Sequence, residues 1–164
     1  MRVLFSFLLF GLALTFTGCD KEKSLLNDVS GEWIIALVDY QTTDGQLVDT
    51  DFGEVRLNFE PCTTEDNQAG DRCDLTVTRA DGSQIHLGYN VLNTRTQGMR
   101  TLQIIGTDRN TEETESSLLH ALLTGNYGFE VSGDQLTAVD SRNGATYRFA
   151  GQSIAEGKIT FRRP

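Results

Sequence analysis

Histidine is scarce in this sequence, and its scarcity weighs against most kinds of active site. The chain has two histidines, His86 and His120. His86 falls on the polar side of an alternating run, and His120 lies beside a row of leucines, so neither stands in a pattern typical of a general base or a metal ligand. We therefore predict no catalytic residues, no metal ligands and no cofactor, and we expect a protein that is not an enzyme.

Basic residues are outnumbered, with 14 Lys and Arg against 23 Asp and Glu, for a net charge of −9. Nucleic-acid binding requires a basic face that displaces counterions from phosphates. The only basic cluster is Arg162-Arg163 at the extreme C-terminus. The charge balance therefore excludes nucleic acid as a partner.

A long apolar run is also missing. The one apolar stretch, from Val3 to Phe16, is shorter than the roughly 20 residues that span a bilayer, and a charged segment begins at Asp20. Arg2 before the stretch and small residues after it are typical of an export signal. This segment is therefore predicted to direct export and not to anchor the protein.

The end of that signal, Leu14-Thr15-Phe16-Thr17-Gly18-Cys19, resembles the lipobox of bacterial lipoproteins. The resemblance implies removal of residues 1–18 and acylation of Cys19 at the new N-terminus. Each buried methylene of such a lipid contributes about 0.8 kcal/mol, so several chains hold firmly. We expect a lipoprotein anchored in a membrane of the cell envelope, facing the periplasm or the cell surface. The alternative is an ordinary secretory signal with an incidental cysteine.

The mature chain would retain 146 of the 164 residues, which suits one domain, and loss of Arg2 would make its charge −10. Residues 19–28 are polar and are predicted to be a tether, with a single domain at 29–164. Once Cys19 is assigned to lipid, Cys62 and Cys73 remain as a pair. Outside the cytoplasm we expect them to form a disulfide worth roughly 2–3 kcal/mol, the alternatives being a metal pair or two reduced thiols.

Period-two alternation of apolar residues, interrupted by tight turns such as Asp81-Gly82 and Asn143-Gly144, predicts a mostly β protein. A single helix is expected over 112–123, capped by Asn110 or Thr111, with a leucine stripe facing the sheet. The fold class is therefore a small antiparallel β-barrel of about eight strands with one packed α-helix near the C-terminal third. The expected strands are 31–38, 54–59, 73–78, 85–91, 100–105, 127–131, 135–139, 146–149 and 159–161.

Two family resemblances carry the same expectation. The order of strand, Thr107 loop, Glu- and Leu-bearing helix and tight hairpins over 101–149 resembles the META-domain lipoproteins of bacterial envelopes. Gly31-Glu32-Trp33 has the Gly-x-Trp spacing that opens lipocalin barrels, and Arg162 or Arg163 is placed to stack over Trp33. Both resemblances imply a small β-barrel that acts mainly by binding.

Aromatic strand residues are the candidates for a ligand site, because an eight-stranded barrel is just wide enough for one small ligand. These are Trp33, Tyr127 and Phe129, which could equally fill the barrel. We therefore expect a binding protein for a small apolar ligand or for an envelope protein partner. The alternative is an inhibitor or accessory factor that inserts the Cys62–Cys73 loop into a protein.

The lipid prediction is tested by Cys19→Ala. Without the thiol no lipid can be attached, so the variant should lose palmitate labelling and should leave the membrane fraction. Continued palmitate incorporation into the variant would show that Cys19 is not the acylated residue.

Overall fold

The computed structural model of the protein describes residues 17–42, 45, 52–68, 72–96, 98–115, 117–140, 147–149 and 152–164. The apolar part of the expected export signal, up to Phe16, lies outside the described residues. So does the turn expected at Asn143-Gly144.

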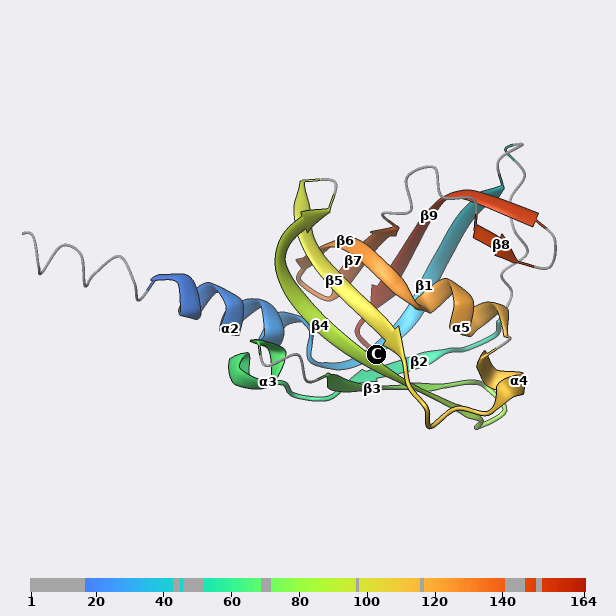
Figure 1. The fold of residues 1–164 in the computed structure, drawn as a ribbon, viewed down its shortest axis with the longest axis horizontal. Helices are drawn as coiled ribbons and strands as arrows, with labels where there is room; N and C mark the ends of the chain where they lie inside the picture. Colours follow the sequence, from blue (N-terminus) through green and yellow to red (C-terminus); the bar gives the residue numbers. More distant parts are fainter. Residues whose placement is uncertain are drawn as a thin grey trace, which may run out of the picture.

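An eight-stranded antiparallel β-barrel forms the body of the protein (Figure 1), which confirms the fold class predicted from the sequence. Neighbours in the chain are neighbours in the sheet from β1 to β7, and β9 then pairs with both β7 and β1, closing the barrel. Strand β8 pairs with β9 at the beginning of that strand. The strands are β1 (Gly31–Thr42), β2 (Arg56–Phe59), β3 (Cys73–Thr78), β4 (Gln84–Thr96), β5 (Met99–Gly106), β6 (Gly125–Ser132), β7 (Gln135–Asp140), β8 (Tyr147–Phe149) and β9 (Gln152–Arg162).

The strands form where the sequence alternates, because successive side chains of a strand point to opposite faces. In β3, Cys73, Leu75 and Val77 are buried and the residues between them are not. The same alternation holds along β2 and β7. Inward apolar residues and outward polar ones thus fix which face of the sheet becomes the interior.

Because each strand reverses the direction of the one before, the connections alternate between the two ends of the barrel. Helix α2 (Thr17–Val29) leads into the start of β1, and α5 (Leu118–Leu123) lies between β5 and β6. The α2 end therefore also carries the β2–β3 connection, the β4–β5 hairpin, the β6–β7 turn and the C-terminus. The α5 end carries the β3–β4 turn and the β5–β6 connection.

The helix expected over 112–123 is divided in two, which corrects the prediction of one continuous helix. Helix α4 (Glu112–Glu115) begins after Thr111, whose hydroxyl accepts a hydrogen bond from the backbone N–H of Thr114. Ser117 then adopts an extended conformation, and its hydroxyl accepts the backbone N–H of His120 to begin α5. Serine competes for backbone partners inside a helix, and this local cap explains the break.

Residues 17–29 form a helix where the sequence predicted a polar tether over 19–28. Its last turn contributes to the core, since Leu26 and Val29 are 1% and 0% exposed. The packed unit therefore begins before Val29, because two apolar side chains on one face of the helix reach the barrel. None of the described helices combines the length and the apolar character needed to cross a membrane.

Large side chains fill the described interior of the barrel. Buried tyrosines place their hydroxyl groups on backbone carbonyls, as burial of a polar group requires. Tyr40 and Tyr127 both donate to the carbonyl of Leu122 in α5, which ties that helix to β1 and β6. The largest side chains that are less than 2% exposed are those of Trp33, Tyr40, Phe59, Tyr89, Tyr127 and Phe161.

The seam between the first and last strands is paired along β1 and β9, and one arginine covers its α2 end. Arg163 places its guanidinium carbon 3.9 Å from the centre of the Trp33 ring, and it donates to the carbonyls of Asp28 and Ser30 at 3.0 and 2.8 Å. Trp33 in turn donates its indole N–H to the carbonyl of Val29 at 2.7 Å. The interaction expected for Arg162 or Arg163 is therefore made by Arg163.

Gly31 is required at this seam for two reasons. Its φ of +102° lies in the region that disfavours other residues, and a Cβ atom there would approach the Arg163 guanidinium to 2.7 Å. The Gly-x-Trp spacing in the sequence thus has a direct steric cause.

We predict that Arg163→Ala lowers the free energy of unfolding by about 2–4 kcal/mol, because it removes a cation–π contact and charge-assisted hydrogen bonds to backbone carbonyls. The free energy of unfolding of Arg163→Lys should lie between those of the wild type and Arg163→Ala, because an ammonium group lacks the planar set of donors of a guanidinium. Urea unfolding followed by the fluorescence of Trp33 measures both. Arg162→Ala, at the exposed neighbouring position, is the matched control and should stay within about 0.5 kcal/mol. Equal urea midpoints for the two alanine variants would contradict the assignment.

Candidate functional site

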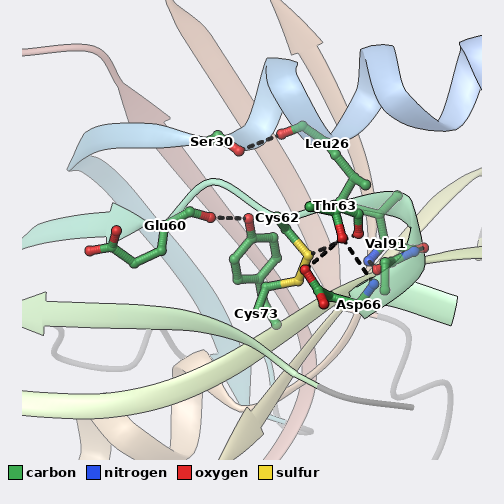
Figure 2. Close-up of a disulfide and its surroundings, with 10 residues drawn as sticks. Leu26, Ser30, Glu60, Cys62, Thr63, Asp66, Cys73 and Val91 are labelled. Carbon is green, nitrogen blue, oxygen red and sulfur yellow. Dashed lines mark hydrogen bonds between the residues drawn. A yellow bond between two sulfur atoms is a disulfide. The ribbon is translucent and has the colours of Figure 1, made fainter. Parts of the chain in front are cut away.

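A disulfide between Cys62 and Cys73 closes the connection from β2 to β3 at the α2 end (Figure 2). The two Cα atoms are 5.5 Å apart, within the usual range for this bond. Cys73 begins β3, and Cys62 lies three residues beyond the end of β2. The pairing predicted from the cysteine count is confirmed, and we call residues 62–73 the stapled loop.

The stapled loop contains a short helix, α3 (Thr64–Gln68), that was not predicted from the sequence. Thr63 caps it by accepting the backbone N–H of Asp66 at 3.1 Å and donating to the Asp66 carboxylate at 2.6 Å. Figure 2 shows these two side chains facing each other beside the disulfide. The Thr-x-x-Asp spacing is close to a capping box and was the available signal for this helix.

Asn67 fastens the stapled loop to the wall of the barrel. Its side-chain amide donates to the carbonyl of Val91 at 2.7 Å and accepts the N–H of Val91 at 2.8 Å. Both groups of one backbone residue in β4 are thus satisfied by a side chain that is 9% exposed. The loop is held at two points, the disulfide and this amide, and it presents α3 as an ordered surface.

Tyr89 supports the base of the stapled loop. It is the cross-strand partner of Cys73, its ring packs edge-on against Phe59 with centroids 5.0 Å apart, and its hydroxyl donates to the carbonyl of Glu60 at 2.6 Å. Burial raises the pKa of the Tyr89 hydroxyl; an interaction with Ser30 opposes this effect and the charge of Glu60 adds to it. Tyr89 is therefore a neutral structural donor and not a proton-transfer group at neutral pH.

The aromatic candidates for a ligand site are all inside the packed core. Trp33, Tyr127 and Phe129 are 0%, 1% and 3% exposed, and the first two donate hydrogen bonds to backbone carbonyls of Val29 and Leu122. Their contacts are with the protein's own side chains. Each of the three therefore has a structural role that accounts for its position.

A hollow of about 260 Å³ opens at the α5 end, and none of these three aromatic residues lines it. It is bounded by Phe52, Leu118 and Leu119 on its apolar side and by Arg79 and Ser117 on its polar side. Arg79 donates to the hydroxyl of Ser117 at 3.0 Å. The volume is just below the range of about 300–1,000 Å³ usual for ligand pockets, so it suits a small group.

The two histidines do not share a site with other metal ligands. His86 lies on β4, and His120 lies on α5, where its ring packs near the backbone of Gly106. Among the residues that the structure describes, no three His, Cys, Asp or Glu side chains are grouped so that they could hold a metal ion. Cys19 lies in α2, apart from the stapled loop cysteines in the sequence, and its side chain is outside what the structure describes.

Comparison with known proteins adds no relative, since no protein-family model, curated protein or solved structure matches this chain.

We predict that Asn67→Asp destabilises the protein by about 2–3 kcal/mol at neutral pH, because the buried carboxylate cannot donate to the carbonyl of Val91. Burial should raise the pKa of the introduced carboxyl, and the protonated acid regains a donor. The loss should therefore shrink as the pH falls through that raised pKa. Urea unfolding across pH 4–8 tests this, with Asn27→Asp at an exposed position of α2 as control. A loss that is the same for both variants, or that grows on acidification, would refute the anchoring role.

Proposed function

We propose that this protein is a non-enzymatic lipoprotein of the bacterial cell envelope, anchored through Cys19, whose barrel serves as a rigid support for binding another envelope protein. The observation that carries the proposal is the packed interior. Trp33, Tyr127 and Phe129 are buried against other core side chains, so they are not exposed to a ligand inside the barrel. Binding is then left to the ends of the barrel and its outer surface.

The stapled loop is the binding surface that we favour. Its backbone is fixed at the disulfide and at Asn67, which lowers the entropy lost when a partner orders it. The exposed side chain of Glu65 projects from α3. This arrangement also supports the alternative function, an inhibitor or accessory factor that acts through the loop.

A small apolar ligand in the hollow at the α5 end is the second candidate. Phe52, Leu118 and Leu119 give it apolar walls, and Arg79 gives it one cation. The two family resemblances, to lipocalins and to META-domain lipoproteins, also favour a binding function. Gly31, Trp33 and Arg163 support a lipocalin-like barrel, and the placement of α4 and α5 between β5 and β6 supports a META-like second half.

The proposal predicts that Glu65→Arg reduces capture of the partner by about tenfold or more, since a reversed charge at the centre of an interface costs several kcal/mol. Capture is measured by crosslinking in intact cells followed by affinity purification. Glu130→Arg makes the same charge change at an exposed position of β6 and should leave capture unchanged. Equal capture by both variants, together with extra mass on the native protein that disappears in Leu118→Arg, would favour the small-ligand function instead.

A further inference from the structure

The β4–β5 hairpin carries two arginines and no acidic residue. The 26 residues between Asp81 and Asp108 contain no Asp or Glu, the longest such gap after Cys19. Arg95 and Arg100 lie near the free end of the hairpin, where they are directly opposite each other across the two strands. The hairpin end is thus a local cationic point on a protein whose net charge is −9.

Neither charge is neutralised within the described part of the chain. Arg100 donates to the side-chain carbonyl of Asn93 at 2.6 Å, and Arg95 donates to the backbone carbonyl of Gly98 at 3.3 Å. Both acceptors are uncharged. By contrast, Arg56 and Arg109 form ion pairs with Glu54 and Asp74 at 2.6 and 3.1 Å.

The stability of the fold does not account for this pair. Like charges directly opposite each other on one face of an antiparallel sheet are destabilising. The Arg95 side chain is exposed and that of Arg100 is half-buried, so packing does not require either charge. An anionic partner would explain why two cations are placed together here.

The fold places the hairpin end at the same end of the barrel as the proposed lipid anchor. Helix α2 contacts β4, and Figure 1 shows α2 and the free end of the hairpin on the same side of the barrel. From Cys19 to Val29 the helix extends only about 15 Å, at 1.5 Å per residue. A lipid on Cys19 would therefore keep the end of the barrel that carries the hairpin near the membrane.

We infer that the β4–β5 hairpin is a second membrane contact, in which Arg95 and Arg100 bind the head groups of anionic phospholipids. This inference rests on the proposed acylation of Cys19. An anionic surface attracts the two arginines and repels the acidic remainder of the protein, so both effects favour the same orientation. In Figure 1, α3 and the hairpin end lie on opposite sides of α2, so a barrel tilted onto its hairpin would leave the stapled loop free for a protein partner.

The test uses the native acylated protein, reconstituted into vesicles of phosphatidylcholine alone or with about one third phosphatidylglycerol. Amide hydrogen exchange is measured at 93–96 and 98–100. Each arginine near an anionic surface should favour the bound orientation about fivefold, so exchange should slow about tenfold or more when phosphatidylglycerol is present. The slowing should disappear in Arg95→Gln/Arg100→Gln and in about 1 M NaCl, which screens surface charge.

Arg56→Gln/Arg109→Gln is the matched control, because it removes the same charge from arginines that are already paired. It should retain the slowing. Equal exchange on both kinds of vesicle, or slowing that appears only when envelope proteins are added, would overturn the inference, the latter in favour of an acidic protein partner. Flotation of the wild type with both kinds of vesicle separates the two proposals, since a protein that floats with neither lacks the lipid anchor itself.

Discussion

The contact between Arg163 and Trp33 is the constraint on which the rest of the barrel depends. A sheet of eight strands closes only if its first and last strands meet in one register, and these two residues lie on those strands or next to them. The same guanidinium also binds carbonyls at the C-terminal end of α2. One side chain therefore links the closing seam of the barrel to the end of the N-terminal helix.

The barrel closes around large aromatic side chains, so its described interior is packed and it can act as a rigid scaffold. Because Trp33, Tyr127 and their neighbours are buried, the candidate binding surfaces lie in the connections at the two ends of the barrel. At the α2 end, the disulfide and Asn67 hold the stapled loop against β4, and the free end of the β4–β5 hairpin lies at the same end of the barrel. At the α5 end, α5 and Phe52 border a small hollow. The contacts that we propose with the membrane, a protein and a small group thus fall on different parts of the fold.

Much of the fold could be predicted from the sequence because strands and turns leave patterns in residues that are close together in the chain. Alternation in Leu75 and Val77, turns such as Asp81-Gly82 and the odd cysteine count led to the correct elements and to the correct disulfide. One error arose where local competition decided the outcome, because Ser117 capped a new helix inside an apparently continuous pattern. The segment predicted as a tether lies in a helix whose last turn places Leu26 in the core.

The sequence alone determined the all-antiparallel class, the acidic character and the pairing of Cys62 with Cys73, since each follows from residues close in the chain or from simple counting. Only the tertiary structure decided that Arg163 and not Arg162 covers Trp33, that Asn67 reaches Val91, and that Tyr127 is packed. Those outcomes depend on contacts between residues that are distant in the sequence. The geometry of these contacts is set only when the sheet closes and its interior becomes packed.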